Sequence, residues 1–203
     1  MDLGPDYVQI LTWNDFGESN YIGPLRETGL GTFEWANALD SAAGINHGGW
    51  RKFLPYYVDI YKTGRVSDLK EGVMAYYRTA PARACPPAWS TTGSGTSKGQ
   101  VKYAPAQLMN DSAFYAALLE SDATVSLTVS IGGKEQAGGF SGYPAAGRGQ
   151  PGIYTGSVPF AGNEGDVVVT IVRAQRTIAT ARYGKPLSTK CEAAVQNWNP
   201  VAI

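Results

Sequence analysis

The chain has little charge and none of the long sequence features of nucleic-acid-binding or membrane-spanning proteins. Charged residues make up 17% of its 203 residues, and 17 basic side chains balance 17 acidic ones. No basic run supplies the electrostatic footprint of a nucleic-acid-binding protein. No apolar stretch approaches the roughly 20 residues that cross a bilayer, and no signal-peptide pattern stands at the start. We therefore expect a soluble protein that binds neither nucleic acid nor membrane, with any export signal elsewhere.

Cysteine and histidine are scarce, which limits redox and metal chemistry. Cys85 and Cys191 lie far apart in the sequence, so they form neither a C-x-x-C redox site nor a zinc site. They predict one long-range disulfide, as in an oxidising compartment, or else two buried free thiols. His47 has no second histidine with which to form a usual metal site, so we predict no metal and no cofactor. A Ser-His-Asp triad has no supporting G-x-S-x-G motif.

Glycine, proline and aromatic residues are plentiful instead. The chain contains 25 glycines, 12 prolines, 12 tyrosines and five tryptophans, and 43% of it is hydrophobic. This composition is typical of a loop-rich extracellular carbohydrate-active protein, with enough apolar material for one large domain or two small ones. Asn110 begins an Asn-Asp-Ser sequon, which predicts N-glycosylation and agrees with secretion.

The most informative segment is an apolar run that leads into two carboxylates. Residues 7–13 are almost continuously apolar, as expected for a strand buried on both faces in a parallel sheet. Asp15 and Glu18 follow directly. Paired carboxylates serve most glycoside hydrolases, where one protonates the leaving oxygen and the other activates water or attacks carbon. Carbohydrate is thus the first substrate class to test, although such a pair is by itself more often solvated or engaged in capping.

One helix is strongly predicted after this segment. Residues 19–48 read as a long irregular connection, with a short helical piece around 33–43, and loops of this length are usually functional. A helix then follows, with Pro55 in its first turn or at a kink and Gly64 as its stop. Its apolar stripe consists of Trp50, Phe53, Leu54, Tyr57, Val58 and Tyr61.

The remainder of the chain predicts an antiparallel β-sandwich, because short alternating runs are separated by turn residues. The strand candidates are 71–78, 113–119, 123–131, 152–160, 166–174 and 177–183, and we expect loops over 80–100 and 132–151. A single β/α unit before them cannot be a domain. Either it is the tail of a (β/α)8 barrel, which takes roughly 250 residues, or the parallel strand is wrongly predicted. We place the boundary between residues 1–66 and 67–203.

Several motifs together resemble one known family. The run from Ile10 to Pro24 (ILTWNDFGESNYIGP), followed by HGGWR from His47 and FLPY from Phe53, closely resembles the late barrel region of glycoside hydrolase family 71. These are the fungal α-1,3-glucanases, or mutanases. The similarity extends through the strand that ends at Arg78, the paired cysteines and the closing run Gln196-Asn197-Trp198-Asn199. The first motif is specific, whereas the β-rich remainder is a looser match.

The resemblance implies a (β/α)8 catalytic barrel followed by an accessory β-sandwich, and hydrolysis of (1→3)-α-D-glucan with inversion. It also implies that Asp15 and Glu18 are catalytic. We assign Glu18 as the general acid and Asp15 as its partner in placing water. A further essential aspartate of the family lies earlier in the barrel, outside this sequence. Asn20 stands where many relatives have histidine, which can alter a substrate contact without touching the carboxylates.

The remaining expectations concern substrate. An inverting hydrolase separates its carboxyl groups by roughly 6.5 to 9.5 Å to admit water, and burial or a neighbouring carboxylate raises the pKa of the acid. Trp13, Asn14, Tyr21 and His47 are predicted to contact the sugar as aromatic platform and hydroxyl partners, although Tyr21 is equally suited to packing and His47 to a structural hydrogen bond.

Two hypotheses follow. The chain is either part of a secreted, cell-wall α-1,3-glucanase, or a noncatalytic β-sandwich protein that binds glucan or has only an interaction role. We expect a monomer with α-1,3-glucan as its partner. We expect the 203 residues alone to have little or no hydrolase activity.

Overall fold

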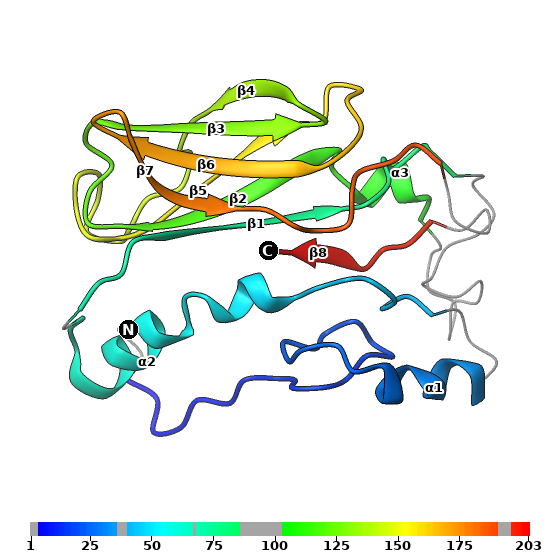
Figure 1. The fold of residues 1–203 in the computed structure, drawn as a ribbon. Coiled ribbons are helices and arrows are strands. Elements are labelled where there is room, and N and C mark those ends of the chain that lie inside the picture. Colours follow the sequence, from blue (N-terminus) through cyan, green and yellow to red (C-terminus); the bar gives the residue numbers. More distant parts are fainter. Residues whose placement is uncertain (1–3, 36–39, 67, 86–102, 191–195) are drawn as a thin grey trace.

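Two four-stranded antiparallel sheets pack face to face, and a part made of short helices and extended chain lies against one of them (Figure 1). This computed structural model describes residues 4–35, 40–66, 68–85, 103–190 and 196–203. The first sheet has the order β5-β2-β1-β8 and the second the order β4-β3-β6-β7. The strands are β1 Gly72–Arg78, β2 Ser112–Leu119, β3 Val125–Ile131, β4 Lys134–Gly138, β5 Gly152–Pro159, β6 Val167–Arg173, β7 Arg176–Ala181 and β8 Pro200–Ala202.

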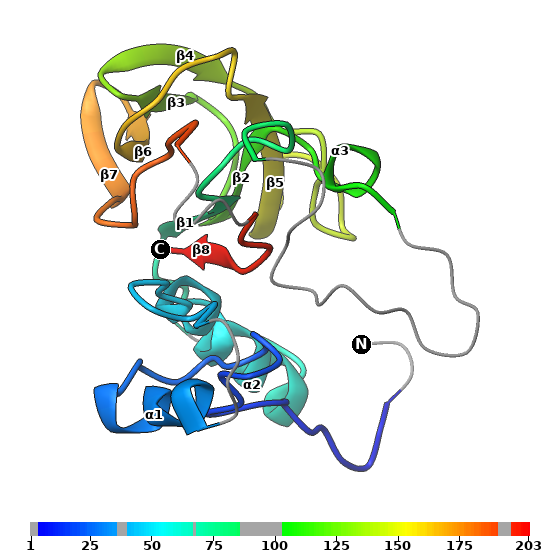
Figure 2. The same ribbon diagram turned by 90° about the vertical axis from the view of Figure 1, so that its right-hand side faces the viewer.

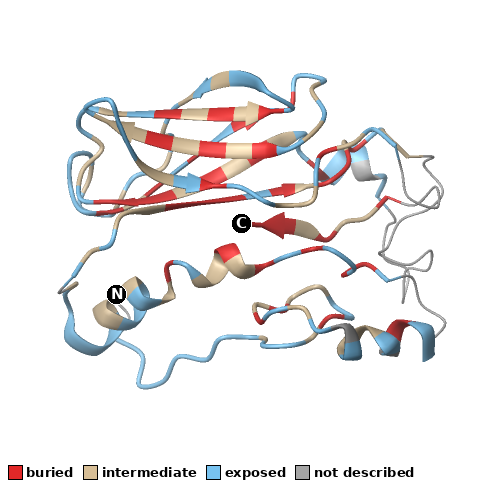
Figure 3. Ribbon diagram, viewed as in Figure 1, coloured by how far each residue is buried: buried red, intermediate tan, exposed pale blue. Residues whose placement is uncertain are grey.

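The predicted β-sandwich is confirmed, and alternation along its strands explains it. Every second side chain points into the space between the sheets, so buried and less buried residues alternate along β3, β5 and β6 (Figure 3). Opposed strands contribute β-branched pairs such as Val129 opposite Val169. The core includes Val73, Ala75, Tyr77, Leu127, Val129, Ile131, Val169 and Ile171. Burying such an aliphatic side chain stabilises the fold by about 1.5–3 kcal/mol.

Two strands lie where the sequence did not predict any. β4 lies inside the predicted loop 132–151. The sequence did not indicate this strand, because its residues are mostly polar and form an edge of the second sheet. Gly132 and Gly133 join it to β3 with φ values of 58° and 82°, which a two-residue hairpin of type I′ requires. β8 is only three residues long and pairs with β1, which is distant in the sequence.

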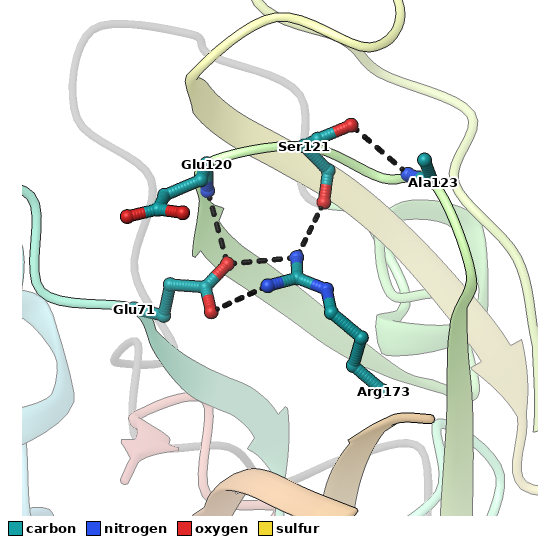
Figure 4. Close-up of polar contacts among 5 residues, drawn as sticks. All are labelled: Glu71, Glu120, Ser121, Ala123 and Arg173. Atoms are coloured by element: carbon teal, nitrogen blue, oxygen red, sulfur yellow. Dashed lines mark hydrogen bonds and ion pairs between the residues drawn. The ribbon is translucent and has the colours of Figure 1, made fainter. Parts of the chain in front are cut away.

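A bidentate ion pair joins the two sheets at one end of the sandwich (Figure 4). Glu71, just before β1, accepts hydrogen bonds from Nη1 and Nη2 of Arg173 in β6, both at 2.8 Å. The Nη2 group of Arg173 also donates to the carbonyl oxygen of Ser121 at 2.7 Å, and the backbone N–H of Glu120 donates to Glu71 Oε1 at 3.0 Å. The ion pair is 18–24% exposed, so solvent screens it less than a surface pair.

The strongly predicted helix is present, although it begins later than its apolar stripe. The helix α2 spans Leu54–Thr63, with Pro55 in its first turn, and Gly64 at φ 71° ends it by donating to Ile60 O at 2.9 Å. A 3-10 turn, η1 (Gly48–Arg51), precedes it. Phe53 packs with Met74 and Leu118 on the outer face of the first sheet. The exposed side chains of the stripe are Tyr57, Val58 and Tyr61.

The other helices are short. The helix α1 spans Glu27–Trp35, so the helical piece predicted around 33–43 begins earlier than expected. The helix α3, Pro105–Leu108, precedes β2. None of the helices in the described ranges combines the length and apolar character that a membrane span requires.

The predicted parallel strand over residues 7–13 is wrong for this structure. The segment is extended chain outside any sheet, and its apolar side chains face solvent, with Tyr7 92% and Leu11 67% exposed. A buried parallel strand needs hydrogen-bonding neighbours on both sides. Among the backbone bonds of the described residues, only residues 20–23 pair with residues 12 and 13, through bonds of 2.8–3.2 Å.

The strand β8 connects the sandwich to the N-terminal part, and Figures 1 and 2 show it between them. On one side it pairs with β1, where Ala202 lies opposite Tyr76. On the other side, the N–H of Ala202 donates to Asn46 O at 2.6 Å. A Cβ atom on Gly49 would lie 2.6 Å from the backbone nitrogen of Ile203, so only glycine permits this close approach.

Candidate active site

The two predicted catalytic carboxylates lie on one tight turn that side-chain hydrogen bonds organise. The N–H of Asp15 donates to Thr12 Oγ1 at 3.0 Å, and the N–H of Glu18 donates to Asp15 Oδ1 at 3.1 Å. Asn20 closes the arrangement, because its Nδ2 donates to Glu18 Oε2 at 3.3 Å while its Oδ1 accepts from Thr12 Oγ1 at 2.8 Å. Asn20, at the position where histidine was expected, thus holds the glutamate directly.

An open hollow of about 390 Å³ adjoins Glu18. It lies between the turn and the C-terminal segment, and its lining residues are Gly17, Glu18, Ser19, Ser41, Trp198, Asn199 and Pro200. Glu18 is exposed, whereas Asp15 is half-buried and is not one of the lining residues. Of the two carboxylates, Glu18 is therefore the one that a molecule in the hollow meets.

Tyr21 and His47 are both fully buried, with 0% exposure, and their rings stack with centroids 3.9 Å apart. The hydroxyl of Tyr21 donates to Ile45 O at 2.6 Å, and burial raises the pKa of Tyr21 to about 12. The His47 nitrogens Nδ1 and Nε2 lie 2.7 Å from Tyr21 O and 2.8 Å from Pro200 O. Burial lowers the pKa of His47, against the opposing effect of these carbonyl groups. In this structure, both residues hold the backbone around the hollow and do not line it.

Trp13 and Asn14 lie on the outside of the turn. Trp13 is 57% exposed, and the guanidinium carbon of Arg51 lies 5.7 Å from its ring centroid. The carbonyl oxygen of Trp13 accepts from the N–H of Gly23 at 2.8 Å, and that of exposed Asn14 accepts from Phe16 at 2.9 Å. Both residues have accessible side chains, but neither lines the hollow, so their contact with sugar stays a prediction.

Apart from Glu18, none of the residues that line the hollow was a predicted site residue, and Ser41, Trp198 and Asn199 lie far from the motif in sequence. Asn199 donates from Nδ2 to the hydroxyl of Tyr21 at 3.2 Å and to Ser41 O at 3.0 Å. Asn197 also donates to Ser41 O, at 3.0 Å. The only sequence signal for the C-terminal residues was their place in the closing run that resembles family 71.

Other predicted sites receive less information from the structure. Asn110 is exposed just before β2, and its glycosylation stays a prediction. Cys191 lies outside the described residues, so its pairing with Cys85 also stays a prediction. In the part of the chain that the structure describes, no three histidine, cysteine or acidic residues gather as metal ligands.

Two carboxylates on one turn, with an open polar hollow beside Glu18, match the residue types that glycoside hydrolases use. Comparison with known proteins gives the family. The chain belongs to glycosyl hydrolase family 71, whose model matches residues 1–203. This confirms the resemblance that the motifs indicated.

Curated relatives are similar at modest identity. A mutanase of Penicillium rubens is 33% identical over 138 residues, which cover 65% of this chain and 27% of that protein. A glucan endo-1,3-alpha-glucosidase of Schizosaccharomyces pombe is 33% identical over 86 residues, 41% of this chain and 19% of the relative. The ascus wall endo-1,3-alpha-glucanase of the same yeast is 36% identical over 78 residues, 37% and 18% respectively. The matches thus span about a quarter or less of each relative. No solved structure gives a significant match.

Proposed function

We propose that the chain carries part of the active site of an α-1,3-glucan hydrolase, with Glu18 as general acid and Asp15 as its partner in placing water. The observation that carries the proposal is the position of Glu18 at a hollow in a chain that family 71 matches throughout. The names of the similar proteins, a mutanase and two endo-1,3-α-glucanases, support the substrate class.

The geometry of the turn supports this division of roles. Glu18 is exposed at the hollow, where its carboxyl group can reach a glycosidic oxygen. Asp15 is half-buried, and its Oδ1 accepts a hydrogen bond from the backbone N–H of Glu18. The aspartate therefore holds the backbone of the glutamate beside it. Tyr21 and His47 are positioning residues in this proposal, while Trp13 and Asn14 remain candidates for sugar contact.

We further propose that residues 1–66 are the end of a (β/α)8 barrel and residues 67–203 its following sandwich. The extended segment with exposed Tyr7, Leu11 and Trp13 has the apolar character of a barrel strand, but the described residues form no strand beside it. The apolar side chains on one face of α2 are likewise exposed to solvent. Polypeptide outside these 203 residues would cover both surfaces, which agrees with the much greater length of the relatives.

One observation favours the second candidate, a noncatalytic glucan-binding protein. The hollow is open and Glu18 faces solvent, whereas a glycosidase encloses its acid. We therefore propose that the isolated 203 residues bind α-1,3-glucan with little or no hydrolysis. The ascus wall in the name of one relative supports our proposal of a secreted protein that acts on fungal walls. We retain the expectation of a monomer.

Hydrolysis tests the catalytic assignment. In a chain completed at its N-terminus by the preceding part of a similar mutanase, Glu18→Gln and Asp15→Asn should each lower the release of reducing sugar from insoluble α-1,3-glucan by about 10³-fold, because each removes an acid or base function. Both substitutions retain an oxygen acceptor, so the unfolding midpoint should not change.

Glu34→Gln serves as the matched control, because Glu34 is an exposed glutamate in α1 away from the hollow. It should retain full activity. Substantial hydrolysis by the Glu18→Gln variant would reject the role of Glu18. Hydrolysis by the isolated 203 residues would reject the proposal that the site needs further polypeptide.

A further inference from the structure

The wall of the hollow that faces Glu18 comes from the opposite end of the sequence. It consists of Trp198 and Asn199 together with Pro200, the first residue of β8 in the sandwich. We propose that this C-terminal segment is a glucan-binding wall of the active site, in which Trp198 and Asn199 contact the glucosyl residue beside Glu18. This inference rests on the proposed function and identifies the residues that bind its substrate.

Asn199 presents an acceptor with an unmet hydrogen-bonding requirement. Its side chain is 2% exposed, and Nδ2 donates both its hydrogens, to the hydroxyl of Tyr21 and to Ser41 O. Its Oδ1 atom is buried without a hydrogen-bond partner among the described residues. A buried oxygen without a donor destabilises the folded chain, because it has lost its hydrogen bonds to water. Asn199 lines the hollow, so its amide is the polar group that this wall offers to the hydroxyl groups of a bound sugar.

Trp198 supplies an aromatic surface beside this acceptor. It is half-buried, and the guanidinium carbon of Arg78 lies 5.9 Å from its ring centroid. Nε of Arg78 also donates to the carbonyl oxygen of Trp198 at 3.1 Å. The tryptophan is therefore held through both its ring and its backbone. An amphipathic, immobilised indole at a polar hollow is suited to the apolar face of a pyranose ring.

The position of this wall is fixed by hydrogen bonds to the residues around it. Asn197 and Asn199 both donate to the carbonyl oxygen of Ser41, and a ring nitrogen of His47 faces Pro200 O. Pro200 in turn pairs with Arg78 of β1. The segment is thus anchored to both the sandwich and the N-terminal part, as a preorganised binding site requires. It follows that the sandwich is a part of the substrate site and not a separable accessory.

Sedimentation with insoluble α-1,3-glucan tests the inference on the 203-residue chain. Trp198→Ala should weaken binding about tenfold, as expected for the loss of an aromatic anchor. Trp35→Ala is the matched control, because Trp35 is 90% exposed in α1 and does not line the hollow. It should bind as the unaltered chain does.

A second variant guards against a loss of folding. If Trp198→Ala lowers the unfolding midpoint, Trp198→Leu decides, because leucine keeps an apolar side chain but has no aromatic face. The inference predicts about tenfold weaker binding for this variant too. Unchanged binding by a folded Trp198 variant would overturn the inference while leaving the proposed function intact. Absence of binding by the unaltered chain, together with no hydrolysis by the completed chain, would overturn both.

Discussion

The sandwich and the N-terminal part use apolar residues in opposite ways. In the sandwich, Val129, Val169 and Ile171 are completely buried between two sheets. In the N-terminal part, Tyr7 and Leu11 are mostly exposed, and a small cluster around Phe16 and Tyr21 forms the local core. The part that carries the candidate carboxylates is therefore the part with the least core of its own. The comparison indicates that the sandwich provides most of the stability, while the chemistry depends on a surface that something else must complete.

Truncating one apolar side chain in each part gives the largest expected difference. Ile171→Ala should lower the free energy of unfolding by about 3 kcal/mol, because it leaves a cavity in the sandwich core. Leu11→Ala should change it by less than about 0.5 kcal/mol, because Leu11 is 67% exposed. Urea unfolding followed by fluorescence measures both. Equal losses in the two variants would show that the extended segment is buried in solution and would remove the contrast.

A smaller effect is expected at the end of the sandwich. Glu71→Gln should cost about 2 kcal/mol, because it removes the charge that pairs with the mostly buried guanidinium of Arg173. Asp68→Asn is the matched control. Its partner Lys70 lies 3.9 Å away and both side chains are more than three-quarters exposed, so its loss should be near zero. A shift in thermal midpoint as small as that of the control would mean that the pair does not join the sheets.

The smallest expected effect is a change of folding stability with pH, which a His47 variant can assign to that residue. The pKa of His47 is lowered from 6.5 in the folded chain, so the unfolded chain binds more protons just below that pH. Stability should therefore be fully present above pH 6.5 and fall as the pH decreases through the folded pKa. Unfolding midpoints between pH 7.5 and pH 5.5 measure this, and His47→Gln should remove the dependence, since the chain has one histidine. A midpoint that rises on acidification would mean that the carbonyls of Tyr21 and Pro200 favour the charged ring.

Much of the sandwich was predictable because its signals are local. The run from Thr124 to Ile131 alternates strictly, and β3 covers almost all of it. The hairpin at Gly132 and Gly133 also had a local signal, two adjacent glycines after an alternating run, although β4 itself was not predicted. The polar residues of an edge strand do not show the periodicity that identifies interior strands.

The candidate site was only partly predictable, for a different reason. Asp15 and Glu18 belong to one short motif, which can be recognised without knowledge of the fold. Ser41 and Asn199 meet at the hollow because the C-terminal segment packs against the N-terminal part, and no local pattern predicts so distant a contact. The prediction of a strand over residues 7–13 was wrong for another reason. The run has the composition of an interior strand, but a strand also needs neighbouring strands, which the described residues do not provide.

The place of β8 has a consequence for attempts to divide the protein by cleavage. A protease that cuts the chain between α2 and β1 would break one peptide bond, but it would not separate the two fragments. The C-terminal fragment would still be hydrogen-bonded to the N-terminal one, through Ala202 to Asn46 and through Pro200 to His47. The two fragments would therefore elute together until a denaturant separated them.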